Sequence, residues 1–195
     1  LGLPAGAVSV GEAQPGAATL ATVRSAPIRQ LVETALATSD NVLAEVLGHE
    51  VARASGKQPD HAGSATAIRD ILVRNGFDAT GLVLSDGSGL STDNRIPAAL
   101  LGQVLSVAAA TPASPDHDPE RTAKLRPLLS GLPVAAGSVG TLSDRYREGP
   151  SVPGRGWVRA KTGTLSGVSS LAGVVTDSEG RLLVFALMSN GTSAD

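Results

Sequence analysis

Apolar residues recur with helical spacing through the first two thirds of the chain. From Pro27 onward they fall at positions i, i+3, i+4, i+7 and i+8, which predicts a helix with this proline in its first turn and a break at Thr38-Ser39-Asp40. A second helix is expected from about residue 41 to 56, with Val42 and Val46 turned inward. Further helices are predicted over the ranges 64–75, 97–110 and 120–129.

The last forty residues follow a different pattern. They hold three strand-like runs, and a hairpin turn is predicted at Asp177-Ser178-Glu179-Gly180 between the second and the third run. Consecutive hairpins imply an antiparallel sheet. We therefore expect an α+β fold within one domain over 1–195, with a mainly helical region at 25–130 and three antiparallel strands within 155–191.

Composition excludes several classes of function. The net charge of -2 and the lack of a basic stripe argue against nucleic acid as a partner. The absence of cysteine excludes disulfides and thiolate metal sites, and His49, His61 and His117 are far apart in the sequence, so no metal or other cofactor is expected. The longest apolar run, 98–110, is shorter than the ~20 residues of a membrane span.

A polar motif, Ser39-Asp40-Asn41, falls in the tight connection between the first two predicted helices. The hydroxyl of Ser39 can accept and donate a hydrogen bond at once, which a proton relay requires. The amide of Asn41 can bond a substrate carbonyl and a catalytic lysine together. Asp40 is expected to point away from the site and tie the connection to the protein.

A second motif, Lys161-Thr162-Gly163-Thr164, lies in the first predicted strand. The ammonium of Lys161 can pair with a free carboxylate, and the hydroxyls of Thr162 and Thr164 can bond the same group. Gly163 has no side chain, so a peptide can approach this strand edge and pair as an extra strand. The motif therefore suits recognition of a peptide C-terminus.

Each motif taken alone is more often structural. A Thr-Ser-Asp string before an apolar helix is usually an N-cap, and Thr92-Asp93-Asn94 is a decoy of the Ser39 motif that follows a turn and precedes Pro97. The turn at Asp86-Gly87-Ser88-Gly89 is also more typical of structure than of catalysis. The joint order of several motifs reverses this expectation for the Ser39 and Lys161 motifs, while the turn at 86–89 is still expected to be structural.

Taken in order, the motifs resemble the C-terminal part of the class C low-molecular-mass penicillin-binding proteins, the D-alanyl-D-alanine carboxypeptidase/endopeptidases. The resemblance covers nearly the whole chain and rests on these stretches: 39–45, 86–91, 132–135, 140–142, 161–164 and 171–173. It implies part of a penicillin-binding/serine β-lactamase-like fold. It also implies cleavage of the terminal D-Ala from peptidoglycan stem peptides through an acyl-enzyme, inhibition by β-lactams, and an extracytoplasmic location in the periplasm or cell envelope of a bacterium.

The resemblance also implies roles for individual residues. Ser39, Asn41 and Lys161 correspond to catalytic positions, and the substrate-binding positions are Thr162, Gly163 and Thr164. By the same resemblance, the backbone N–H of Thr164 is one donor of the oxyanion hole. The N–H of the nucleophile itself is the other.

The family's nucleophile motif, Ser-x-x-Lys, is absent from these residues. The chain has three lysines, and the residues three positions before them are Ala54, Arg121 and Val158. We therefore expect the nucleophile in a missing N-terminal part of the same protein, together with any export signal, because residues 1–10 lack a basic region. The chain alone is expected to be inactive.

Two alternatives stay open at this point. One is a β-lactamase or esterase on the same scaffold, against which the stretches 86–91 and 140–142 favour the carboxypeptidase. The other is a non-catalytic module that binds muropeptides and has lost its nucleophile. The presence or absence of Ser-x-x-Lys upstream separates an enzyme from a binding module.

Overall fold

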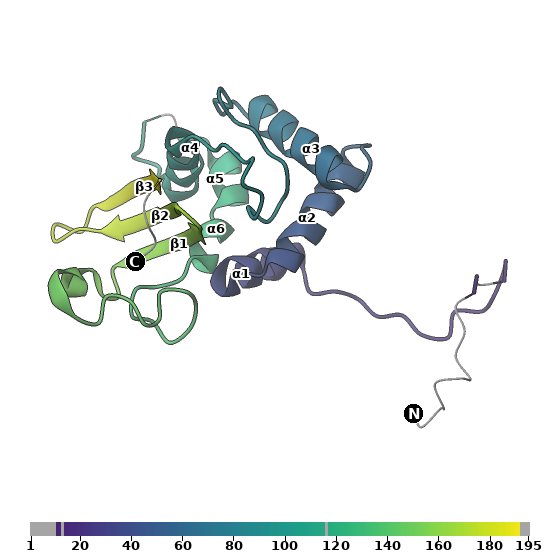
Figure 1. Cartoon of the computed structure of the whole chain (residues 1–195), viewed down its shortest axis with the longest axis horizontal. Coiled ribbons are helices and arrows are strands. Elements are labelled where there is room, and N and C mark those ends of the chain that lie inside the picture. The colour runs from purple at the N-terminus through teal and green to yellow at the C-terminus, as the bar shows by residue number, and fades with distance from the viewer. Residues whose placement is uncertain (1–10, 13, 116, 192–195) are drawn as a thin grey trace.

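The computed structural model of the chain describes residues 11–12, 14–115 and 117–191. Within them, helices come first and a sheet comes last, which confirms the α+β expectation (Figure 1). The elements are α1 (Ile28–Thr38), α2 (Asn41–Ala54), α3 (His61–Arg74), α4 (Ala98–Ala109), α5 (Pro119–Leu125), α6 (Pro127–Gly131), the 3-10 helix η2 (Gly149–Gly154), β1 (Val158–Leu165), β2 (Val168–Thr176) and β3 (Leu182–Asn190).

The strands form an antiparallel sheet in the order β1-β2-β3, joined by two hairpins. Asp177 closes the second hairpin, where its side chain accepts hydrogen bonds from the N–H groups of Glu179 and Arg181. One face of the sheet packs against α4. On the other face, Ala135 and Leu142 from the segment before β1 pack against Val158 and its neighbours. Elements therefore pack on both faces of the sheet, although Leu183 and Leu187 on β3 stay exposed, and β1 lies at one edge.

Capping residues decide where the helices begin. The side chain of Asp60 accepts a hydrogen bond from the N–H of Gly63, so α3 starts at His61, three residues before the predicted start. The helix predicted over 120–129 is two short helices, because Pro127 has no N–H with which to continue the hydrogen-bond ladder of α5.

The inner face of α2 differs from the prediction. Val42 and Val46 were expected to point inward, but they are 74% and 49% exposed. The buried residues of α2 are instead Gly48 and Ala52, because α2 packs closely on α3 through small side chains. A Cβ atom at Gly48 would lie 3.5 Å from the side chain of Ser64 on α3.

Figure 1 shows α1 lying between the sheet and the α2–α3 pair, so the α1–α2 corner comes close to β1. Residues 17–27 have no helix or strand until α1 begins and extend away from the helices. Among the residues that the structure describes, none of the helices has the length and apolar character needed to cross a membrane.

Candidate active site

The corner between α1 and α2 consists of Ser39 and Asp40 alone. Ser39 has φ 57° and ψ 46°, a left-handed conformation that is uncommon for residues other than glycine and costs about 1–3 kcal/mol. Asp40 holds the corner, because its N–H bonds Ala35 O on α1 and its carboxylate accepts from the N–H of Leu43 on α2. Asp40 thus caps α2, and the Ser39 hydroxyl is carried on a backbone that both helices fix.

The Lys161 side chain on β1 reaches this corner. Its Nζ donates to Ser39 Oγ at 2.8 Å and to the carbonyl oxygen of Thr162 at 2.7 Å. The two residues are 122 positions apart in the sequence. Burial lowers the pKa of Lys161 below its ordinary value, because the surrounding protein solvates the charged ammonium less well than water does.

The outer edge of β1 is paired in its first half only. Ala160 N donates to Pro133 O and Ala135 N donates to Val158 O, each at 2.9 Å. Backbone groups of a strand alternate between its two edges, so the N–H and C=O groups of Thr162 and Thr164 point to the same outer edge. In the described chain, no strand pairs with that second half of the edge. It is open to an added peptide strand.

Thr162 is fixed by a contact with the stretch 140–142. Its hydroxyl donates to Thr141 Oγ1 at 3.0 Å. Gly140 has φ 94°, and a Cβ atom there would lie 3.1 Å from the carbonyl oxygen of Ala37 on α1. This stretch therefore packs between α1 and β1 and fixes the distance between the two motifs.

Gly163 has a second structural reason to lack a side chain. A Cβ atom at this position would lie 2.3 Å from Oγ of Ser170, its partner residue on β2. The Ser170 hydroxyl occupies that space. The prediction from sequence, that Gly163 leaves the edge open to a peptide, did not include this contact.

Asn41 is the first residue of α2 and lines a pocket of about 460 Å³ together with the turn at 85–91. Among the described residues, its side chain makes no hydrogen bond to Ser39 or Lys161. The structure thus joins Ser39, Lys161 and Thr162 directly, and it places Asn41 on the adjoining pocket. The expected bond between Asn41 and a catalytic lysine stays a prediction.

Glu45 is a residue whose role the sequence did not reveal. It lies one helical turn after Asn41, and its two carboxylate oxygens accept hydrogen bonds from the N–H groups of Gly87 and Ser88, each at 3.0 Å. Burial alone would raise the pKa of Glu45, but the hydrogen bonds from Ser88 and Gly87 outweigh it, so the pKa lies below its usual value. The carboxylate therefore fixes the turn to α2.

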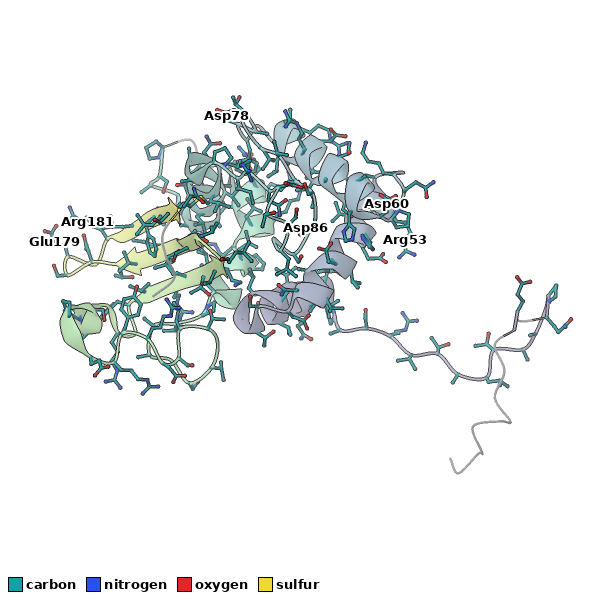
Figure 2. All side chains as sticks on the ribbon, in the orientation of Figure 1. Arg53, Asp60, Asp78, Asp86, Glu179 and Arg181 are labelled. Carbon is teal, nitrogen blue, oxygen red and sulfur yellow. The ribbon has the colours of Figure 1, made fainter. Side chains whose placement is uncertain are left out.

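The turn itself is closed by Asp86, which is labelled in Figure 2. Its carboxylate accepts from the N–H groups of Gly89 and Ser91 and from the side chain of Asn94. Burial acts to raise the pKa of Asp86, and these hydrogen bonds lower it by more, so the pKa lies below its usual value. These contacts agree with a structural rather than a catalytic turn.

Two of the histidines, which are far apart in the sequence, lie next to each other in the fold. The ring centroids of His49 and His61 are 5.5 Å apart in an edge-to-face arrangement. The reason is tertiary, because α2 and α3 are joined by a short connection and pack against each other. His61 Nδ1 also lies 3.2 Å from the Glu45 carboxylate.

Comparisons with known proteins identify the family of the chain. The sequence profile described as the D-Ala-D-Ala carboxypeptidase 3 (S13) family matches residues 4–195. A carboxypeptidase of Mycobacterium tuberculosis is 43% identical over 97% of this chain and 39% of its own length. Carboxypeptidase DacB of Mycolicibacterium smegmatis is 44% identical over 90% of this chain and 36% of its own length.

A solved structure shares the fold as well. Penicillin-binding protein 4 of Haemophilus influenzae, in a complex with a β-lactam, superimposes with a TM-score of 0.73 at 32% identity. The match covers 87% of this chain and 36% of that protein. The chain thus spans less than two fifths of the length of these relatives. It belongs to the D-Ala-D-Ala carboxypeptidase 3 (S13) family, which confirms the resemblance to class C low-molecular-mass penicillin-binding proteins.

Proposed function

We propose that this chain carries half of the active site of a serine D-alanyl-D-alanine carboxypeptidase. The substrates are the stem peptides of peptidoglycan, which are cleaved through an acyl-enzyme. The observation that carries the proposal is the 2.8 Å contact between Lys161 Nζ and Ser39 Oγ beside the open edge of β1. A cation, a hydroxyl and an unpaired strand edge at one place suit a peptide that ends in a carboxylate.

The open half of β1 binds the substrate backbone in this proposal. A D-Ala-D-Ala peptide pairs with Thr162 and Thr164 as an added strand, and the Thr164 N–H points at the carbonyl oxygen under attack. Lys161 Nζ lies near the terminal carboxylate and is already held there by the Thr162 carbonyl. These contacts select a peptide C-terminus over an internal bond.

Ser39 carries the proton to the leaving group. The nucleophile gives its hydroxyl proton to the lysine of its own motif and attacks the carbonyl carbon of the D-Ala-D-Ala bond. The C–N bond breaks, and the departing nitrogen takes a proton from Ser39 Oγ. Lys161 returns a proton to Ser39 Oγ along the existing hydrogen bond. Burial lowers the pKa of Lys161, which makes its ammonium a better proton donor for this step. Water then releases the shortened peptide.

The nucleophile belongs to a Ser-x-x-Lys motif outside these 195 residues, in the N-terminal part of the same protein. No serine stands three positions before any lysine of the chain, and the chain spans only 39% of its relative from M. tuberculosis. We place the whole protein outside the cytoplasm, in the periplasm or cell envelope, with peptidoglycan peptides and β-lactams as its ligands. The β-lactam complex of the H. influenzae relative supports this choice of ligand.

The test is D-Ala release from a D-Ala-D-Ala peptide by the complete protein. Ser39→Ala should lower turnover roughly 10²–10⁴-fold, the range for loss of an acid–base group. Ser178→Ala, in the exposed β2–β3 turn, is the matched control and should leave turnover unchanged. Near-normal turnover by Ser39→Ala would rule out the relay.

A labelling experiment tests where the nucleophile lies. The isolated chain should stay unlabelled by a fluorescent penicillin on a denaturing gel. Adding the N-terminal part should restore labelling where the two parts associate. A covalent adduct on the isolated chain would mean that one of its own serines is the nucleophile.

A further inference from the structure

Three side chains with metal-binding groups meet where α2 faces the start of α3. Glu45, His49 and His61 each offer one ligand atom, and these atoms lie within 4.8 Å of one another. Glu45 and His49 are one helical turn apart on α2, and His61 is the first residue of α3. Asp60, labelled in Figure 2, marks the end of α3 at which the cluster lies.

One of these groups is buried without a partner. Nε2 of His49 is shielded from solvent and has no hydrogen-bond partner among the described residues. A buried polar atom without a partner costs about 1–3 kcal/mol, so such atoms in folded proteins call for an explanation. The edge-to-face contact with the His61 ring does not supply a hydrogen bond. A bound cation would use the free lone pair of His49.

The two other ligands are arranged to accept the same cation. His61 Nδ1 and Glu45 Oε2 are 3.2 Å apart, and in a tetrahedral zinc site with bonds of ~2.0–2.1 Å neighbouring ligand atoms are separated by roughly 3.4 Å. The ligand atom of His49 lies within 4.8 Å of the other two. The Glu45 carboxylate has lone pairs beyond those that accept from Gly87 and Ser88, so metal binding leaves the turn attached.

We propose that Glu45, His49 and His61 bind a zinc ion. Two imidazoles and one carboxylate are a ligand set that zinc takes in proteins, with a fourth position left for water or another ligand. Calcium and magnesium prefer sets made of oxygen alone, so they fit this cluster less well. Neither Ser39 nor Lys161 is among its ligands, so the proposal does not depend on the proposed carboxypeptidase activity.

The zinc site has a structural consequence. It ties α2 to α3 and, through Glu45, to the turn at 85–91. Glu45 and His61 line the same pocket as Asn41, so the ion braces the wall of that pocket. The bound ion would therefore hold α2, α3 and the turn at 85–91 together beside the active-site region.

The experiment is a zinc titration of the complete protein after removal of metals with a chelator. The wild type should bind one equivalent of zinc, while calcium and magnesium at the same concentration should not compete. His61→Ala and His49→Ala should each weaken zinc binding by more than about 100-fold, beyond the roughly 10–100-fold typical of losing an outer-shell partner. His117→Ala is the matched control, because His117 lies outside the cluster, and it should bind zinc like the wild type.

Loss of zinc binding in the variants can be distinguished from misfolding. The His61 side chain is 62% exposed, so its removal leaves the packing of α2 and α3 intact, which circular dichroism verifies. The wild type loaded with cobalt(II) gives a second measurement, in which a four-coordinate site shows intense visible absorption and a six-coordinate ion shows weak absorption. Absence of zinc binding, an equal loss in His117→Ala, or a weak six-coordinate spectrum would overturn the proposal.

Discussion

Glu45→Gln is the substitution that best isolates the link between α2 and the turn at 85–91. Glutamine keeps the shape of the side chain but replaces one oxygen by an NH₂ group, which cannot accept a hydrogen bond. In the wild type, Oε2 accepts from Gly87 N–H and Oε1 from Ser88 N–H. One of these two donors must therefore lose its partner, and the other must bond a neutral group.

The expected magnitude follows from these two changes. A backbone N–H that loses its partner in a mostly buried place costs about 1–3 kcal/mol, and exchange of a charged for a neutral acceptor costs about 1 kcal/mol more. The Glu45 side chain is 20% exposed, so water replaces little of this loss. Glu45→Gln should lower the free energy of unfolding by about 2–4 kcal/mol, a fall in Tm on the order of 10 °C.

The assay is urea unfolding of the metal-free protein followed by circular dichroism. Glu50→Gln is the control, because Glu50 lies on the same helix in an exposed ion pair with Arg53 and should contribute less than about 1 kcal/mol. Equal destabilisation by the two substitutions would refute the assigned role of Glu45.

The same variant has a characteristic pH dependence. The folded-state pKa of Glu45 lies below its ordinary value of 4.5, so its contribution to stability is complete above that pH and is lost as the pH falls through the folded-state pKa. The gap in unfolding free energy between wild type and Glu45→Gln should be constant from neutral pH to about pH 5 and should shrink in stronger acid. A gap that stays the same at pH 3 would contradict the proposed ionic hydrogen bonds.

Two further predictions concern the catalytic corner and the strand edge. Ser39→Gly removes the strain of a left-handed serine, so its free energy of unfolding should be about 1 kcal/mol higher than that of Ser39→Ala. Both variants should turn over D-Ala-D-Ala peptides equally poorly, and equal stability of the two would show that the corner is unstrained. Gly163→Ala should lower peptide turnover because the new Cβ atom meets Ser170 Oγ. The double variant with Ser170→Ala should recover a large part of the lost turnover. Failure of this rescue would mean that the new methyl group blocks the substrate instead.

Local signals in the sequence located most of the helices and strands. The periodicity after Pro27 and the turn at 177–180 depend only on neighbouring residues, and both are found where they were predicted. The early start of α3 depends on Asp60 as its cap, a signal that was present but not used. The exposure of Val42 and Val46 could not be predicted, because periodicity marks an apolar face but not which part of the fold covers it.

The residues of the site were predicted from the family resemblance, whereas their contacts were not. The resemblance singled out Ser39 and Lys161, but their hydrogen bond depends on how α1 packs beside β1, which spacing does not encode. The pairing of His49 with His61 depends on the rotation of α2 against α3. Glu45 was noticed only as part of a matching stretch, because an acidic residue on a helix gives no sign of a distant backbone partner.

The central claim is that Lys161 recognises the C-terminal carboxylate of the substrate at the edge of β1. Lys161 also donates to Ser39 Oγ, so Lys161→Ala should slow turnover of every substrate to some extent. On a substrate with a free carboxylate, the substitution also removes a charge-assisted hydrogen bond worth about 1.5–3 kcal/mol, which lowers kcat/KM by a further factor of roughly 10–100. Lys124 is exposed on α5 and paired with Glu120, so Lys124→Ala is the control and should leave kcat/KM on both substrates unchanged.

The decisive measurement compares kcat/KM of Lys161→Ala and of the wild-type protein on two peptides, one that ends in D-Ala-D-Ala and the same peptide with a C-terminal amide. We predict that the substitution costs roughly 10–100-fold more on the free acid than on the amide, because only the acid offers a charge to pair with. Equal losses on both peptides would contradict the claim and would show that Lys161 acts on the proton relay or on the fold alone.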